Sequence, residues 1–171
     1  MVYQPKFYYM RLPLETFNNS ITKEIIYLSD IPQAGFKIHP LFVDENDNEL
    51  DYVLISAYEG CAQIDSSTYD LVDSSNINFN SAKLASIIDA KPISGVNKEF
   101  TLANATKMAQ NRGTGWDITN LYVESCNQML MLVEYCTFNI QNALGKGVTE
   151  VNNSDSYNCS VLTGSTMALN N

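Results

Sequence analysis

Hydrophobic and polar positions along residues 1–60 follow the pattern of β-strands. Aromatic and aliphatic side chains form short runs or alternate with polar ones, which is typical of extended chain. The expected strands cover residues 6–12, 25–28, 35–43 and 52–58. Polar turn-forming residues at 44–49 separate the last two runs, so we predict a hairpin with an acidic tip there.

The pattern changes over residues 61–99, where Ser, Asn and Asp dominate. A short apolar run at 84–88 is the main interruption, and it can form one strand. Long polar stretches of this kind usually run over the protein surface. We therefore expect residues 61–99 to be an exposed loop, together with the acidic tip near Asp47.

Helical periodicity begins at residue 100. Thr101 can cap a helix that buries Met108 and Ala109 and stops at Gly113, and Phe100 can pack onto Ala105. A second, longer helix should follow, with apolar residues at three-to-four spacing from Tyr122 to Cys136 and one broad buried face. The tail from 148 onward is rich in Asn, Ser and Thr, with one expected strand at 159–163.

These patterns predict an α+β fold in three segments. They are a β-rich part at 1–60, the polar loop at 61–99 and a two-helix part at 100–171 whose C-terminal strands are incomplete. The long helix would then lack enough strand to cover its apolar stripe. We expect a partner surface or a further segment to supply that cover.

The charge excludes some classes of partner. Ten basic residues against nineteen acidic ones give a net charge of −9, so neither nucleic acid nor an anionic membrane surface is an expected partner. The chain has no apolar run long enough to span a membrane, and its first residues do not resemble a signal peptide. We expect the protein to stay where it is made, or to leave in an assembled particle or by lysis.

No pattern of residues predicts catalysis, a cofactor or a metal. Asp44, Asn46 and Asn48 alternate as in a calcium loop, but the glycine and the bidentate glutamate of such a loop are missing. His39 is more simply a strand or loop histidine. The four cysteines form no zinc-like or redox pair, and we interpret Cys126 and Cys136 as small buried side chains. We therefore expect a protein that is not an enzyme.

One aromatic side chain should have a structural role. Trp116 lies between the two expected helices, and a single Trp in such a place usually buries its ring, although an exposed ring could stack on a sugar. The ten tyrosines agree with a protein interface or a saccharide site, but they do not identify a ligand.

The most specific pattern runs from Asn111 to Gly147. It reads N-R-G-T-G-W-D-I, then a helix ending L-V-E-Y, then N-I-Q-N-A-L-G-K-G. In this order and spacing it resembles the pattern of phage and prophage virion proteins of the tail-fibre or receptor-binding type, which have a C-type-lectin-like domain. The residues that match that pattern are Arg112, Gly113, Gly115, Trp116, Glu134, Tyr135, Asn139, Gln141, Gly145 and Gly147.

The resemblance implies a non-enzymatic structural protein in a tail fibre, baseplate or other exposed appendage of the virion. It implies a C-type-lectin-like fold, and partners that are other virion proteins or further copies, with a trimer favoured. A bacterial surface saccharide or protein is the implied receptor. Family members continue beyond the position of Asn171, so the resemblance also implies a truncated domain and carries over no binding site.

Two alternatives remain open at this point. One is a bacterial cell-surface adhesin or carbohydrate-binding module of the same fold. The other is an oxidoreductase related to the formylglycine-generating enzymes, which have the lectin-like fold and need a reactive cysteine pair.

Overall fold

The computed structural model describes residues 1–65, 77–93, 100–145 and 162–164. It is a mixed α+β structure with antiparallel sheets and few helices, as the sequence predicts. The chain divides into two compact units, and each takes strands from the front of the sequence and a helix from the back. The first unit comprises residues 2–55 and 119–145. The second comprises residues 56–118 and 162–164 among those described, together with Met1.

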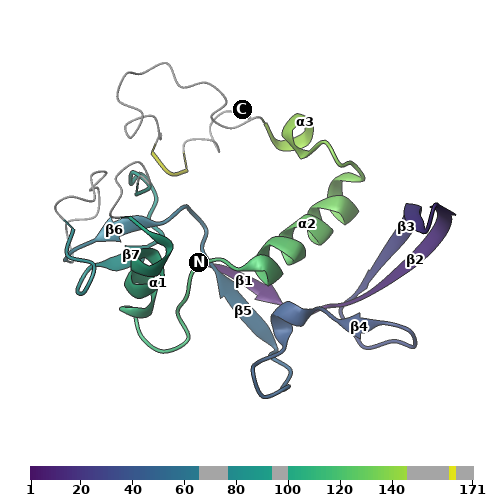
Figure 1. The fold of residues 1–171 in the computed structure, drawn as a ribbon, viewed down its shortest axis with the longest axis horizontal. Helices are drawn as coiled ribbons and strands as arrows, with labels where there is room; N and C mark the ends of the chain where they lie inside the picture. Colours follow the sequence, from purple (N-terminus) through teal and green to yellow (C-terminus); the bar gives the residue numbers. More distant parts are fainter. Residues whose placement is uncertain (66–76, 94–99, 146–161, 165–171) are drawn as a thin grey trace. The chain divides into compact units, whose positions relative to one another are not determined.

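Antiparallel strands and one long helix make up the first unit (Figure 1). Its elements are β1 (Val2–Pro5), β2 (Tyr8–Phe17), β3 (Ser20–Ser29), β4 (Lys37–Ile38), the 3-10 helix η1 (Pro40–Phe42), β5 (Tyr52–Ile55), α2 (Leu121–Tyr135) and α3 (Ile140–Leu144). β1 pairs with β5, and a second sheet has the order β3-β2-β4. The core under these strands consists of Phe7, Phe42 and Cys126, with half-buried neighbours such as Leu28 and Val53.

The predicted hairpin with the acidic tip is wrong in its pairing. β4 pairs with β2, and β5 pairs with β1, so only the isolated bridge between Val43 and Glu49 joins the two flanking segments. Pro40 stops the predicted strand, because its fixed φ favours the first turn of a helix, and η1 follows at once. The tip itself is exposed from Glu45 to Glu49, as expected.

The second unit contains β6 (Cys61–Gln63), β7 (Lys83–Ala85) and α1 (Leu102–Gln110). β6 and β7 pair antiparallel, and the described part of the expected exposed loop therefore contains two strands. Small side chains explain why it can be buried: Ala62 and Ala82 pack with Ile77 and Met108 of α1, and Phe100 joins this cluster from the residue before the helix cap. The prediction of an exposed 61–99 loop is wrong for these residues, because alanines supply a core that a search for large apolar residues misses.

The two long helices lie where the periodicity predicts them. Thr101 caps α1 through a hydrogen bond from Asn104 N to its Oγ1 (3.3 Å), and Met108 and Ala109 are buried. Asn120 caps α2 by accepting from the backbone N–H groups of Tyr122 and Val123.

The expected broad buried face of α2 is not present, since Cys126 is its one buried residue. Tyr122, Val133 and Tyr135 are each more than two-fifths exposed. Within the described residues of the first unit, Met129 and Leu130 pack against the core beside Cys126, and the apolar residues at the two ends of α2 are exposed. None of the described helices combines the length and apolar composition that a membrane-spanning helix requires.

Candidate functional site

A groove of about 370 Å³ lies in the first unit beside the N-terminal half of α2. Its walls come from β2, from the turn that leads into η1 and from two turns of α2. They combine aromatic rings with charged and amide groups: Tyr9, Arg11, His39, Pro40, Leu121, Tyr122, Glu124, Ser125, Gln128 and Met129.

His39 is the most buried polar group of this groove, with 1% of its surface exposed. Its Nδ1 accepts a hydrogen bond from the backbone N–H of Leu41 at 3.2 Å, which caps η1. Nε2 therefore holds the ring proton and donates it to Ser125 Oγ at 3.3 Å. The serine receives this hydrogen bond, whereas a nucleophilic serine has to give its proton to the histidine. The pair joins η1 to α2.

The surroundings of His39 favour the neutral ring. The rings of Phe7, Tyr9 and Phe42 lie around it, with centroids 5.3, 5.8 and 6.2 Å away. Burial among these groups lowers the pKa of His39 below its ordinary value of 6.5. The imidazole is therefore an uncharged structural group at neutral pH.

Arg11 brings a positive charge to the groove, but Glu24 neutralises it. The guanidinium donates from Nε at 3.0 Å and from Nη2 at 2.7 Å to the two carboxylate oxygens of Glu24, in a bidentate pair between β2 and β3. Such a pair fixes the planar group geometrically. The groups of this groove that could contact a ligand are therefore the rings of Tyr9 and Tyr122 and the side chains of Glu124 and Gln128.

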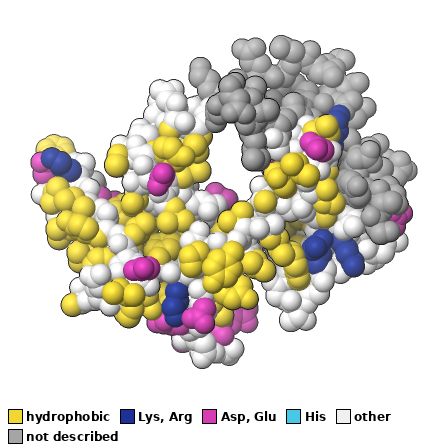
Figure 2. All heavy atoms as spheres, turned by 180° about the vertical axis from the view of Figure 1, so that it is seen from behind, with side chains coloured by type: hydrophobic (Ala, Val, Ile, Leu, Met, Phe, Trp, Pro, Cys, Tyr) yellow, Lys and Arg dark blue, Asp and Glu magenta, His cyan; other side chains and the backbone are white. Residues whose placement is uncertain are grey.

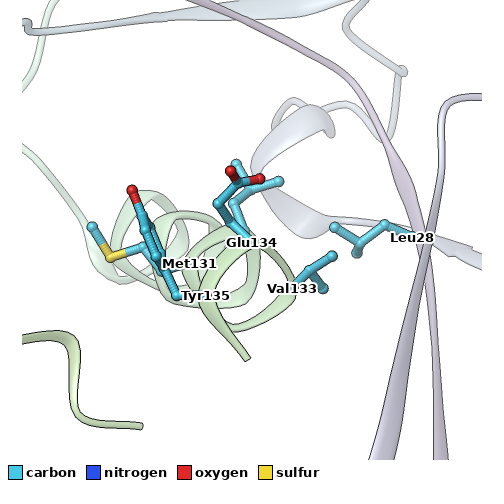
Figure 3. Close-up of a pocket in the computed structure, with 6 residues that line it drawn as sticks. Leu28, Met131, Val133, Glu134 and Tyr135 are labelled. Carbon is cyan, nitrogen blue, oxygen red and sulfur yellow. The ribbon is translucent and has the colours of Figure 1, made fainter. Parts of the chain in front are cut away.

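A second hollow of about 330 Å³ lies at the other end of α2 (Figure 3). Leu28 of β3 forms one wall, and α2 supplies the others with Leu130, Met131, Val133, Glu134 and Tyr135. Its lining is mostly apolar, and Glu134 is the one charged group. Two residues of the Asn111–Gly147 pattern, which we call the motif pattern, therefore line this hollow: Glu134 and Tyr135.

The first part of the motif pattern forms a small cluster in the second unit. The guanidinium of Arg112 stacks over the Trp116 ring, 4.4 Å from its centroid, and Nη1 donates to the backbone oxygen of Leu84 at 3.3 Å. Gly113 and Gly115 have φ values of 132° and 83°, which few other residues adopt. These contacts tie the turn after α1 to β7. Trp116 is half-buried, less than its expected burial.

The last part of the motif pattern belongs to α3 in the first unit. Asn139 caps α3 by accepting from Asn142 N at 3.1 Å, and Gly145 ends the helix with a φ of 106°. Gln141 is exposed, and its backbone oxygen accepts from Gly145 N. Gly147 lies outside the described residues, as does most of the expected strand at 159–163. The structure thus distributes the motif residues over several local clusters.

Two structural side chains were not identified as such from the sequence. Asn111 donates from its side-chain amide to the backbone oxygens of Phe79 (3.0 Å) and Ala82 (2.8 Å), joining the end of α1 to the segment before β7. Thr163 exchanges backbone hydrogen bonds with Asp89 and Ala90, and its hydroxyl donates to the Ile87 oxygen at 2.5 Å. The position of Asn111 near the end of the predicted helix was a usable signal for the first. The second depends on a contact across more than seventy residues and had none.

Polar groups at the acidic tip satisfy one another. The side-chain amide of Asn48 donates to Asp44 Oδ2 at 3.0 Å, and the backbone N–H groups of Asn48 and Asn46 donate to Oδ1, both at 2.8 Å. These hydrogen bonds hold the pKa of Asp44 below its usual value. Within residues 1–65, 77–93, 100–145 and 162–164, no three His, Cys, Asp or Glu side chains gather in a way that could hold a metal ion.

The cysteines differ in environment. Cys61 and Cys126 are buried, and burial raises the pKa of both thiols, that of Cys126 to about 11, so both are protonated at neutral pH. Cys136 was expected to be buried and is exposed. It ends α2 in the left-handed conformation, with a φ of 50°, which turns the chain out of the helix before its side chain can reach the core.

Comparison of the chain with protein-family models, with curated proteins and with solved structures found no match.

Proposed function

We propose that this chain is a non-enzymatic structural protein of a phage or prophage virion, in a tail fibre, baseplate or similar appendage. Its domain would be a variant of the C-type-lectin-like fold. The observation that carries the proposal is the amount of apolar surface exposed on the β2–β3 arm, the ribbon formed by residues Tyr8–Ser29.

The arm exposes large apolar side chains at its tip and on its outer face. They are Leu12 (44%), Leu14 (47%), Phe17 (70%), Ile21 (51%), Ile25 (36%) and Tyr27 (41%). On the side of the molecule seen in Figure 2, hydrophobic side chains likewise form broad areas among scattered charges. Soluble monomers rarely leave large contiguous apolar surface in water. A subunit of an assembly covers it with neighbouring subunits.

The motif residues support a structural role more than a chemical one. Arg112 and Trp116 hold a turn against β7, and Asn139 and Gly145 begin and end a helix. Glycines with positive φ and capping side chains maintain backbone geometry. This is the kind of pattern that a shared fold would retain whatever its ligand.

Recognition of a bacterial surface receptor would use the groove beside α2 in this proposal. Tyr9 and Tyr122 offer ring faces, and Glu124 and Gln128 offer hydrogen-bonding groups, within one hollow of the first unit. Rings with neighbouring polar groups can bind either a saccharide or a polar protein segment. A Gln128→Ala and Tyr122→Ala pair of variants should lose attachment to host cells while the particle still assembles.

Mass spectrometry of purified particles tests the proposal. We expect peptides of this chain at several copies per particle in phage or induced prophage preparations from the source culture. The same preparation after high-salt washing should retain them, because salt does not weaken apolar contacts. Peptides found in the cell-surface fraction and missing from the particles would contradict the virion role and favour the adhesin alternative.

A further inference from the structure

We propose that the outer edge of β3 is an interface at which two copies of this chain pair through antiparallel β3 strands. The inference rests on the assembly part of the proposed function and adds the partner and the contact. It does not depend on whether the assembly is a virion.

The hydrogen bonds of the sheet show which backbone groups point to that edge. The N–H of His39 donates to the Phe7 oxygen at 3.2 Å, and Tyr9 pairs with Lys37, so odd-numbered residues of this strand direct their backbone groups toward β4. Even-numbered residues must then face β3, because the groups alternate along a strand. Their partners on β3 are Ile25 opposite Leu12, Tyr27 opposite Met10 and Ser29 opposite Tyr8.

The remaining β3 residues therefore point away from β2. Glu24, Ile26 and Leu28 direct their N–H and C=O groups to the outer side, and among the described residues β3 pairs with β2 alone. Over Glu24–Ser29 the register is regular, and the shifts come only nearer the tip. An unpaired, regular row of donors and acceptors is a template for another strand.

The other edge of the ribbon is protected, and this contrast singles out β3. Pro13 is an odd-numbered residue of β2, so its missing N–H would have pointed to the free side beyond β4. Register shifts on both sides of Glu15 also disturb that strand. Proline and irregular register are common protections of sheet edges against added strands. Residues 24–29 of β3 contain neither.

Stability of the ribbon also favours an added strand. β4 extends the sheet beside only Tyr8 and Tyr9, so the rest of the arm has just two strands (Figure 1). A two-stranded ribbon is marginal in water, whereas three or more strands with an apolar face are stable. Two copies joined at β3 would form a β2-β3-β3-β2 sheet and would continue the outer face of Ile25 and Tyr27 across the junction.

The neutral charge of the arm allows a second copy to be the occupant. The whole chain has a net charge of −9, so two copies repel each other over most of their surfaces. The arm is neutral: Arg11 pairs with Glu24 at 2.7 Å and Lys23 with Glu15 at 3.7 Å. Two arms can therefore approach without net repulsion. Antiparallel pairing of identical strands is two-fold symmetric, so this contact builds a dimer and not the trimer that the resemblance implies.

Amide hydrogen exchange of the full chain tests the pairing directly. As the protein concentration rises through the micromolar range, exchange at Glu24, Ile26 and Leu28 should slow together with the appearance of a dimer in sedimentation. The amides of Ile25, Tyr27 and Ser29 should already be slow at the lowest concentration. A chain that stays monomeric overturns the inference, as does a dimer in which the first three amides are unchanged.

A matched pair of variants at Ile26 distinguishes the contribution of the backbone N–H at the strand edge from that of the side chain. Ile26→Pro removes one outward N–H per copy and spares the bonds to β2, whereas Ile26→Ala keeps the N–H and removes most of the side chain. We expect Ile26→Pro to weaken the dimer about tenfold or more and Ile26→Ala to weaken it less. Equal weakening by both would overturn the role of the backbone edge.

Failures of the two proposals are distinguishable. A monomeric chain that is nevertheless present in purified particles would overturn the β3 pairing and leave the virion role intact. A β3-paired dimer that is missing from particles would do the opposite.

Discussion

His39 is the residue whose environment most depends on the tertiary structure. Its ring caps η1 with one nitrogen and holds Ser125 of α2 with the other, between the rings of Phe7 and Phe42. A protonated ring could not accept from Leu41 N–H, and its charge would be buried among apolar groups. The folded first unit therefore requires neutral His39.

Acidification should destabilise the protein because of His39. The unfolded chain protonates this residue at its ordinary pKa of 6.5, whereas the folded pKa is lower. The free energy of unfolding should therefore fall as pH drops below that value, until the folded pKa is reached. Urea titrations across this range measure the slope. This slope can be assigned to His39 because the chain has one histidine. The His39→Phe variant should lose the slope, and an equal slope in the wild type and the variant would contradict the assignment.

Asn111 should matter through its side-chain amide. Asn111→Ala leaves the carbonyl oxygens of Phe79 and Ala82 without these donors, which should lower the free energy of unfolding by about 2 kcal/mol. Gln110→Ala, next to it and exposed, is the matched control and should change little. Chemical denaturation of both variants makes the comparison, and similar losses would mean that the effect comes from the helix end in general.

At the scale of elements, the caps and the small-residue core decide where helices and strands form. Asn120 accepts two backbone hydrogen bonds and begins α2 at Leu121, and Cys136 ends it. In the second unit, β6 and β7 pack against α1 through Ala62, Ala82 and Met108. The sequence locates both helices because the Thr101 cap before α1 and the apolar spacing along α2 are local signals.

Removal of the α2 cap should cost measurable stability. Asn120→Ala loses the acceptor for Tyr122 N and Val123 N, with an expected cost of about 1 kcal/mol in the free energy of unfolding. Asn120→Ser keeps a capping oxygen and should retain most of the stability. Circular dichroism during thermal unfolding compares the two, and equal losses would contradict the capping role.

The packing of α1 in the core of the second unit should contribute measurably to the free energy of unfolding. Met108 is fully buried, so Met108→Ala opens a cavity and should cost about 3 kcal/mol. Leu102→Ala, on the same helix and 74% exposed, should be nearly neutral. Chemical denaturation compares the two variants, and an unchanged free energy of unfolding for Met108→Ala would contradict the packing of α1 on β6 and β7.

At the scale of the whole molecule, a strongly acidic chain carries a neutral, apolar arm. The net charge of −9 resists self-association, while the arm offers exposed Leu, Ile and Phe side chains and an unpaired strand edge. Electrostatic repulsion opposes contact between copies over most of the surface, but the neutral arm does not add to this repulsion.

Salt should strengthen the association of arms. Screening reduces repulsion between the acidic copies, and the ion pairs of the arm are internal, so they hold no partner. We expect a lower dimer dissociation constant at about 0.5 M sodium chloride than at low salt, measured by sedimentation. Weaker association at high salt would indicate an interface made of charge pairs.

The sequence alone determined what depends on neighbouring residues. Periodicity and the Thr101 cap gave both long helices, parts of the front strands and the α+β class, since side-chain spacing and local hydrogen bonds set these features; β1 and residues 13–24 of the β2–β3 arm were not predicted. The sequence did not predict which strands pair, because pairing depends on contacts between distant segments. In the structure β4 pairs with β2 and β5 pairs with β1. The tertiary structure also buried alanines in a core, left the two ends of α2 exposed and placed His39 beside Ser125. Burial is a property of what packs against a residue, and the identity of the residue does not by itself contain it.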